Sequence, residues 1–483
     1  IAETFAMHHG VFNQEMWDWY SRGYTPAGVE VWNAMRALDY LETRTGIDAN
    51  RFAITGRSGG AAMSWFTAAV DPRIKVAIPV MGISTNAANV EAGTQRGHCD
   101  CMFCINVHKQ DMLHQGGLIA PRPLLMMHGS KDDLFPVPGY TQFEQVVGKL
   151  YAGYGMKDAF GNVVVETGHQ DSDFLREQAI RFLDKHLMKI PPRSLDMDYS
   201  NAPQEQLAVF GGKPPEDAEN FRVHETFTTH KGLRQFDSGA DWQERKKSLL
   251  ATLRALLPEH TADPAPRTVV HKPRKATGKA PAILYIASDG EGDRYHNLVL
   301  RGAHTRDETV RVVAWPRGVG EIPWPRETQR DMLRDAMLIG ETVDSLRLRD
   351  VRAALRQVQQ MPEVDTSRIT IVGRGVSGIL GLYAELFEPR VVEPAVQQVI
   401  LIDAPESHRE GPVFLNVMRH TDLPEVAALL APRRLLFYGQ MPDAYTHTKT
   451  LFARAGAAAN VSVVMHLEYA AMGNYGHGMA SGH

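Results

Sequence analysis

The second half of this chain repeats the first half, and no other sequence feature constrains the possible fold so strongly. The segment Arg51-Phe-Ala-Ile-Thr-Gly-Arg57 returns as Arg368-Ile-Thr-Ile-Val-Gly-Arg374. Two further pairs follow in the same order and at a nearly constant offset, namely Asp71-Pro-Arg73 with Glu388-Pro-Arg390, and Ala120-Pro-Arg-Pro-Leu-Leu125 with Ala431-Pro-Arg-Arg-Leu-Leu436. Self-similarity of this kind indicates a repeated architecture. The sequence therefore predicts two tandem copies of one fold.

Within each half, short apolar segments alternate with longer segments of helical periodicity. In the first half we expect strands at residues 51–55, 74–80, 123–127 and 163–165, and helices at 28–41, 61–70 and 174–187. In the second half we expect strands at 281–287, 310–315 and 369–372, and a helical stretch at 326–361. Such alternation is typical of an α/β fold with a doubly wound, mainly parallel sheet.

Composition shifts set the predicted domain boundaries. Residues from about 189 to 220 are rich in Pro, Asn, Glu, Gly and Asp, which is typical of a linker. We expect a first domain at 1–190, a linker at 191–220 and a second domain at 221–483. An insert at about 84–117 separates the second and third strands of the first domain, where a substrate lid would lie.

The overall composition argues against two classes of partner. Hydrophobic residues make up 43% of the chain and charged residues 22%, as in ordinary globular proteins. The formal net charge of −4 gives no reason to expect nucleic acid or an anionic membrane surface as a partner. No apolar run approaches the roughly 18 residues of a membrane-spanning helix.

The cysteines lie close together in the insert. Cys99, Cys101 and Cys104 are the only three in the chain, and an odd number in so short a stretch is not a disulfide framework. Their spacing beside His98 would suit a soft metal such as zinc. A structural zinc usually takes two separated pairs of ligands, however, and the chain has no second cysteine pair. We therefore expect no metal, a loop of partly buried thiols, and no cofactor.

A glycine-rich turn supplies the candidate nucleophile. Gly56-Arg57-Ser58-Gly59-Gly60 fits the pattern G-x-S-x-G, in which flanking glycines allow a sharp strand-to-helix turn that presents the serine. The pattern follows a predicted strand and precedes a predicted helix, which is the context it requires. The alternative is a glycine-rich turn with an idle serine. We predict that Ser58 is a nucleophile and that the backbone N–H of Gly59 is an oxyanion donor.

An acid and a base follow in the order that such a nucleophile needs. Asp132 comes just after the strand at 123–127, with Asp133 as the competing acid, and His169 lies in the loop after the last strand. The histidine would accept the Ser58 proton and return it to the leaving alcohol, while the carboxylate fixes the tautomer of the ring. Other histidines lack this combination of chain order and loop position, namely His8, His9, His98, His108, His114 and His128.

The second copy lacks the nucleophile. Gly375 stands where Ser58 stands in the first copy, and Ser377 lies two residues deeper in the predicted helix. Asp443 falls near the position of Asp132, and Gly476-His477 is a candidate counterpart of Gly168-His169. We expect a degenerate second domain that acts as a structural or binding partner of the first.

At these residues the chain resembles the acetyl xylan esterase-like branch of the α/β-hydrolases, near dienelactone hydrolases and prolyl-oligopeptidase-type peptidases. The resemblance covers about residues 5–190 and rests on the segments 17–26, 56–60, 71–80, 98–101, 120–125 and 168–169. It implies serine hydrolysis of a small ester or an acylated saccharide by an exported bacterial enzyme, secreted or periplasmic. Arg57, Trp17 and Trp19 are candidate substrate contacts, although aromatic clusters more often belong to the core.

The resemblance also implies earlier strands, one of which leads to the loop with a second oxyanion donor. No apolar run before residue 51 matches such a strand. We therefore expect an N-terminally truncated first domain whose strand at 51–55 lies at the sheet edge. The alternatives to an esterase are a prolyl-oligopeptidase-type peptidase and a catalytically inactive binding module.

Overall fold

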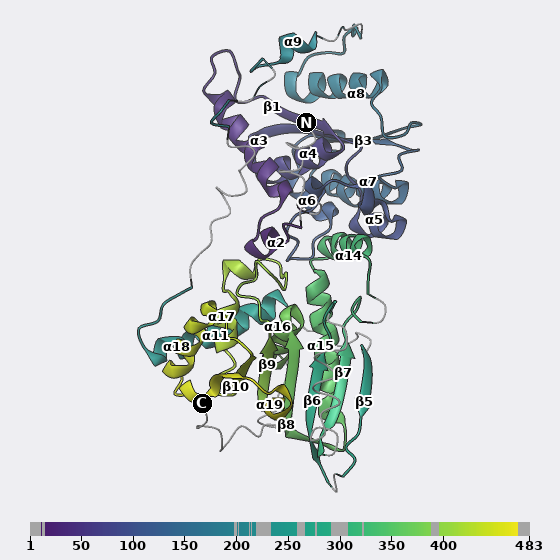
Figure 1. Ribbon diagram of the computed structural model, residues 1–483. Helices are drawn as coiled ribbons and strands as arrows, with labels where there is room; N and C mark the ends of the chain where they lie inside the picture. Colours follow the sequence, from purple (N-terminus) through teal and green to yellow (C-terminus); the bar gives the residue numbers. More distant parts are fainter. Residues whose placement is uncertain are drawn as a thin grey trace. The chain divides into compact units, whose positions relative to one another are not determined.

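The computed structural model describes residues 11, 15–197, 200, 202–211, 213, 215–218, 233–257, 266–275, 278–290, 308–320, 323–387 and 396–471. Its chain forms two compact units, each a mixed α/β structure built on a mainly parallel sheet (Figure 1). Unit 1 contains residues 1–19, 24–229 and 331–340, and unit 2 contains residues 20–23, 230–330 and 341–483. The short segment 331–340 therefore belongs to unit 1, although the predicted boundaries assign it to the second domain.

The sheet of unit 1 has four parallel strands in chain order. They are β1 (Phe52–Arg57), β2 (Ile74–Val80), β3 (Leu124–Gly129) and β4 (Phe160–Val165). Every residue of β3 is buried, as in a strand that helices cover on both faces. Within the described residues β1 pairs with β2 alone, so β1 lies at the edge of this sheet.

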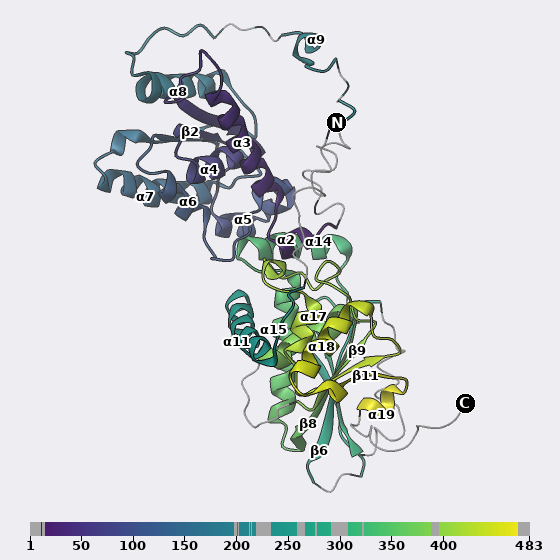
Figure 2. The same cartoon turned by 90° about the vertical axis from the view of Figure 1, so that its left-hand side faces the viewer.

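Helices cover both faces of this sheet, as Figure 2 shows. Leu175 and Phe182 of α8 (Asp173–Leu183) pack on one face against Ile78 and Met127. The other face is covered by α4 (Gly59–Val70) and α7 (Val137–Gly153). The other α-helices described in the first 230 residues are α2 (Asp18–Arg22), α3 (Pro26–Glu42), α5 (Asn86–Ala92), α6 (Met112–Ile119) and α9 (Gln204–Leu207).

The sheet of unit 2 has seven strands in the order β11-β10-β9-β8-β6-β7-β5, of which only β5 is antiparallel to its neighbour. The strands are β5 (Arg267–His271), β6 (Ala280–Ile286), β7 (Val310–Trp315), β8 (Val364–Arg374), β9 (Gln398–Ile402), β10 (Arg434–Tyr438) and β11 (Val461–Val464). The α-helices described wholly within unit 2 are α11 (Gly239–Leu256), α15 (Val343–Gln360), α16 (Gly375–Phe387), α17 (Leu423–Ala428), α18 (Thr446–Arg454) and α19 (Leu467–Ala471).

The helical stretch expected at 326–361 is two helices. The first is α14 (Arg326–Leu338), and α15 begins after the N-cap Thr342. Gly340 has a φ of 75°, a left-handed conformation that a helix cannot continue through. The Thr342 hydroxyl then accepts a hydrogen bond from the N–H of Ser345 and starts the second helix.

Four strands of unit 2 have the same arrangement as the four strands of unit 1. The order β1-β2-β3-β4 corresponds to β8-β9-β10-β11, again with every pair parallel. In unit 1, Arg57 aligns with Val80, and in unit 2, Arg374 aligns with Ile402. The difference is at β8, which pairs with β6 on its other side.

Candidate active site

The turn between β1 and α4 presents Ser58. Its φ of 58° and ψ of −121° are a strained conformation for a residue with a Cβ atom. A Cβ atom on Gly56 would lie 2.5 Å from the carbonyl oxygen of Gly60, and one on Gly82 would collide with the carbonyl oxygen of Ser58. The strand-to-helix turn therefore closes only because glycines stand at these two positions.

Gly59 is the first residue of helix α4, so its N–H group has no acceptor within the helix. The helix N-terminus also carries partial positive charge, which favours an anion at this point. Both properties suit an oxyanion donor beside the serine.

Asp132 and His169 contact each other. The Nδ1 atom of His169 lies 2.9 Å from Oδ2 of Asp132. The Asp132 side chain is 1% exposed, and its other oxygen accepts a hydrogen bond from the N–H of Leu134. Asp133, the competing acid, is exposed and makes no such contact with the ring.

Backbone hydrogen bonds place the three candidate loops in a row at the carboxyl ends of the parallel strands. The N–H of Ser58 donates to Val80 O at 3.0 Å, and the N–H of Met81 donates to Met127 O at 2.8 Å. After β3, the N–H of Ser130 donates to Val165 O at 2.8 Å. Ligands of open α/β sheets bind at this edge.

No hydrogen bond joins the Ser58 hydroxyl to His169, two residues that are both described. The structure therefore brings Asp132 and His169 together and places Ser58 on the same edge of the sheet, without the serine–histidine bond. In unliganded sites such bonds are often long and tighten when substrate binds.

A row of stacked aromatic rings packs against His169. The Phe135 ring stacks on His169 at 5.8 Å between centroids, and the His98 ring stacks on Phe135 at 4.8 Å. The Nε2 atom of His98 lies 2.9 Å from Leu134 O, and burial lowers the pKa of His98 to about 4. A neutral His98 therefore donates from Nε2 to the loop that follows Asp132. From the sequence, His98 was a rival base and a possible neighbour of a metal-binding cysteine cluster, and its position in the insert gave no sign of this role.

The other rival histidines lie elsewhere or outside the described residues. His128 is buried, stacks on Tyr140 at 4.1 Å, and has a pKa lowered to about 3 by burial. The ring of His114 accepts from the N–H of Asp111 and caps helix α6. His8 and His9 are not among the described residues.

One predicted substrate contact is corrected by the structure. Trp19 is 2% exposed, so its ring belongs to the core and has no face free for a sugar. Trp17 is half-buried, and Arg57 is exposed beside Ser58.

The pairing of the three cysteines in the insert differs from the prediction of three free thiols. Cys99 and Cys101 form a disulfide, while Cys104 is free. A Cβ atom built on Gly59 would lie 2.9 Å from the sulfur of Cys101 and 3.4 Å from that of Cys99, so both sulfurs pack closely against Gly59. Among the described residues no group of three or more His, Cys, Asp or Glu side chains is arranged as a metal site.

Among the described residues of unit 2, the counterparts of the candidate site do not come together as a second site of this kind. Gly375 has a φ of 53° at the turn after β8. The Ser377 hydroxyl is buried and donates to Ala287 O at 2.8 Å. Asp443 is exposed, and Gly476-His477 lie outside the described residues.

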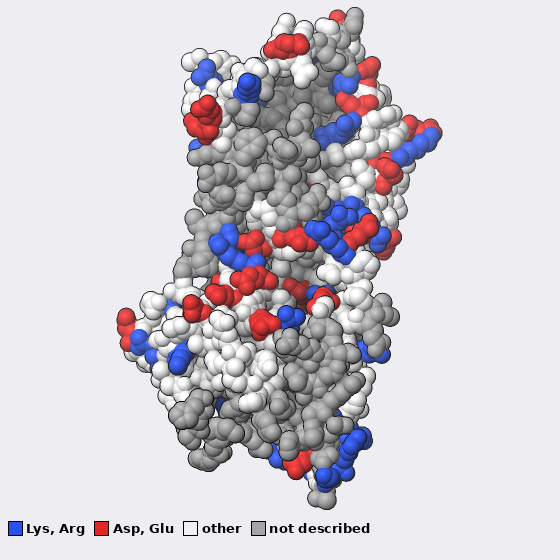
Figure 3. All heavy atoms as spheres, viewed as in Figure 1, with Lys and Arg blue, Asp and Glu red and all other residues white. Residues whose placement is uncertain are grey.

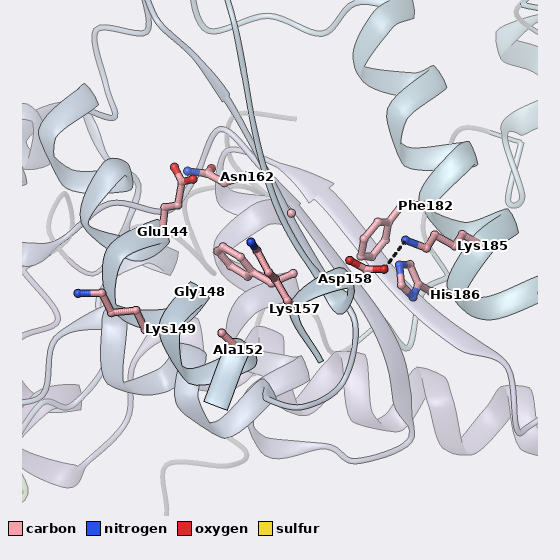
Figure 4. A pocket seen from close by; sticks show the side chains of 12 residues that line it. Glu144, Gly148, Lys149, Ala152, Lys157, Asp158, Asn162, Phe182, Lys185 and His186 are labelled. Carbon is pink, nitrogen blue, oxygen red and sulfur yellow. Dashed lines mark ion pairs between the residues drawn. The ribbon is translucent and has the colours of Figure 1, made fainter. Parts of the chain in front are cut away.

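A groove of about 620 Å³ lies away from the candidate triad (Figure 4). Residues of α7, β4 and the end of α8 line it, and Lys185 pairs there with Asp158 at 3.9 Å. Ser58, Asp132 and His169 do not line this groove.

The charged surface is mixed. On the face drawn in Figure 3, the described basic and acidic side chains are interspersed. Among the described helices, none combines the length and apolar character needed to cross a lipid bilayer.

Comparisons with known proteins match parts of this chain. A family model described as "PhoPQ-activated pathogenicity-related protein" matches residues 1–95. The "Putative hydrolase YtaP" of Bacillus subtilis is 31% identical over 161 residues, which are 33% of this chain and 54% of that protein. The chain thus spans about half the length of this curated relative.

Two solved structures show limited similarity to this chain. A "putative acetyl xylan esterase" from Bacteroides fragilis has a TM-score of 0.40 and 13% identity, over 52% of this chain and 82% of that chain. A glucuronoyl esterase from Sporotrichum thermophile has a TM-score of 0.32 and 21% identity, over 40% of this chain and 60% of that chain.

Proposed function

We propose that this chain, a member of the α/β-hydrolase superfamily, is a serine carboxylic ester hydrolase that works through an acyl-enzyme on Ser58. The observation that carries the proposal is the strained φ of 58° at Ser58. A serine held in that conformation between a strand and a helix is costly, and such strain concentrates at functional sites. The buried Asp132 bonded to His169 supplies the partners that activate a serine.

The proposed reaction proceeds in two halves. Ser58 Oγ attacks the ester carbonyl while Nε2 of His169 accepts its proton, and the oxyanion accepts a hydrogen bond from Gly59 N–H. His169 then protonates the departing alcohol, which leaves the acyl group on Ser58. Water, deprotonated by His169, attacks the acyl group and regenerates the serine. Asp132 stabilises the imidazolium in both halves.

For the substrate we propose an acetyl ester on a saccharide, in line with the resemblance found in the sequence. A prolyl-oligopeptidase-type peptidase remains the alternative, because the triad itself does not distinguish an ester from an amide. A panel of aryl acetates, acetylated oligosaccharides and peptide anilides separates the two, and we expect turnover of acetates only.

We also propose that the two units are tandem copies and that the second copy is degenerate. The shared order of four strands supports this. So does the residue directly after the second of these strands, which has a positive φ in both copies, 48° at Met81 and 46° at Asp403. Arg51 bonds Asp48 Oδ2 at 2.6 Å, and Arg368 bonds Asp365 Oδ2 at the same distance. The domain boundaries and the missing early strands of the first copy stay predictions.

Labelling with a fluorophosphonate probe, followed by mapping of the modified peptide, tests the proposal. We expect a covalent adduct on Ser58, no adduct in the Ser58→Ala variant, and loss of ester hydrolysis in that variant. A folded protein without an adduct, or with one on another residue, contradicts the assignment.

A further inference from the structure

We propose that Arg334 of helix α14 is a positioning residue for the oxyanion side of the active site. It would hold the loop 95–106, here named the cysteine loop, against Gly59. The inference rests on the proposed function, and it gives residues 331–340 a catalytic purpose within unit 1.

Arg334 is tied to the cysteine loop at two points. Its Nη1 atom donates to Arg96 O at 2.7 Å, and its Nη2 atom donates to Asp100 Oδ1 at 3.2 Å. Its guanidinium also lies over the Phe103 ring, 5.7 Å from the centroid. Arg334 is 8% exposed and Asp100 is 1% exposed, so both charges are buried in the pair.

The same segment holds both ends of the loop. The carbonyl oxygen of Leu338 accepts a hydrogen bond from Asn106 Nδ2 at 2.8 Å, and Asp335 accepts one from the Gln95 amide. Asn86, just before the loop, also donates to Leu338 O at 2.9 Å. The loop is therefore attached to residues 334–338 at its start, middle and end.

The tied positions flank the residues that contact the active site. The sulfurs of Cys99 and Cys101 pack on Gly59. Cys99 lies between the two anchor residues Arg96 and Asp100, and Cys101 directly follows Asp100. His98 lies in the same stretch and supports His169 through Phe135. A shift of the loop therefore reaches both the oxyanion donor and the base.

Removing one partner of a buried ion pair leaves an uncompensated charge. Without Arg334, the loop must move to hydrate Asp100, and the disulfide loses its contact with Gly59. Misplacement of groups around a reacting centre costs up to about 100-fold in rate. We expect the loss in kcat and little change in KM, because an oxyanion donor acts on the transition state.

The test uses the full-length chain. Arg334→Met is expected to lower the rate of fluorophosphonate labelling of Ser58, and kcat for an aryl acetate, by at least about 10-fold. Arg181→Met is the matched control, since Arg181 is 43% exposed and pairs with Glu177 on the surface of α8 at 2.6 Å, outside the cysteine loop. We expect less than about a 2-fold effect there, as for surface ion pairs in general.

A double variant separates positioning from stability. D100N/R334M leaves no unpaired buried charge, so its melting temperature should return towards that of the wild type, while its labelling stays at least about 10-fold slow because the ties are gone. Labelling at the wild-type rate in either folded variant overturns the inference. If Arg334→Met does not fold, the double variant decides.

Hydrogen exchange of residues 95–106 gives a readout that does not depend on activity. We expect faster exchange in both variants at position 334, and unchanged exchange overturns the inference. Absence of Ser58 labelling in the wild type would contradict the proposed function alone, since the exchange measurement still reports on the loop.

Discussion

Ser58 and Gly375 occupy corresponding turns with nearly the same φ, 58° and 53°. Glycine adopts this conformation without steric cost, whereas serine does not. The first turn therefore holds a serine in a strained backbone conformation, whereas the second turn has a glycine, which adopts this backbone conformation without strain. At the scale of single residues, this contrast separates a proposed catalytic turn from a structural one.

The acid of the proposed triad gives the first prediction. Asp132→Asn should fold, because the amide is isosteric, but it should lower kcat by roughly 10⁴-fold, because the ring loses the carboxylate that sets its tautomer. Steady-state hydrolysis of an aryl acetate measures this. The exposed neighbour provides the control, and Asp133→Asn should stay close to wild-type activity. Equal losses in the two variants would assign the wrong acid.

His98 gives a prediction about pH. Its pKa is lowered to about 4 in the folded chain, from 6.5 in the unfolded chain, so between these values the unfolded state binds more protons. Stability should therefore fall as the pH drops from about 6.5 to about 4, with up to about 3 kcal/mol from this residue. Urea denaturation at pH 7 and pH 5 should show a smaller difference for His98→Gln than for the wild type. An unchanged pH dependence would show that His98 does not contribute.

At the scale of elements, the strand-to-helix turn depends on the close approach of the Gly56 backbone to the Gly60 backbone, which leaves no room for a Cβ atom on Gly56. Gly56, the second-last residue of β1, lies against the backbone of Gly60, whereas a Cβ atom on Gly60 would meet nothing within 4 Å. The same strand lies at the edge of its described sheet, while β8 is paired on both sides. The turn is therefore supported by α4 and by β2. The N–H of Ser58 donates a hydrogen bond to the carbonyl oxygen of Val80 at the end of β2.

The two glycines form a matched pair for a stability test. Gly56→Ala should destabilise the chain by about 1–3 kcal/mol or more, because the new methyl group meets backbone atoms that cannot rotate away. Gly60→Ala should change stability by much less. Urea denaturation compares the two, and similar losses would mean that the turn can relax around residue 56.

At the scale of the whole molecule, two units carry corresponding strands, yet only one has the residues of a serine hydrolase site among those described. Each unit also contains a short segment from the other half of the sequence. Residues 20–23 belong to unit 2, and residues 331–340 belong to unit 1. The proposed role of Arg334 gives the segment 331–340 a function within unit 1.

Labelling stoichiometry tests this asymmetry. Intact-mass measurement after fluorophosphonate treatment should show one adduct per chain, and Ser377→Ala should still show one. The Ser377 hydroxyl is buried and bonded to Ala287 O, so its loss should cost only about 1 kcal/mol of stability. Two adducts per chain, or one that disappears in Ser377→Ala, would contradict a single nucleophile.

The sequence by itself determined the elements and the chain order of the candidate site. Strand and helix periodicity, the glycines around Ser58, and an acid and a histidine in loops after strands are local patterns, and local backbone preferences decide them. In the second half the same signals indicated β6, β7 and β8, but not β5, β9, β10 and β11. The break of the helical stretch at Gly340 was also present locally, as a glycine followed by a capping threonine.

Only the tertiary structure decided what these elements contact. Burial of Trp19, the disulfide of Cys99 with Cys101, and the stack of His98 on Phe135 involve packing that no local periodicity encodes. The ion pair of Arg334 with Asp100 joins residues 234 positions apart in the chain. Such contacts depend on which surfaces remain to be covered once the sheet has formed, and that is a property of the folded chain as a whole.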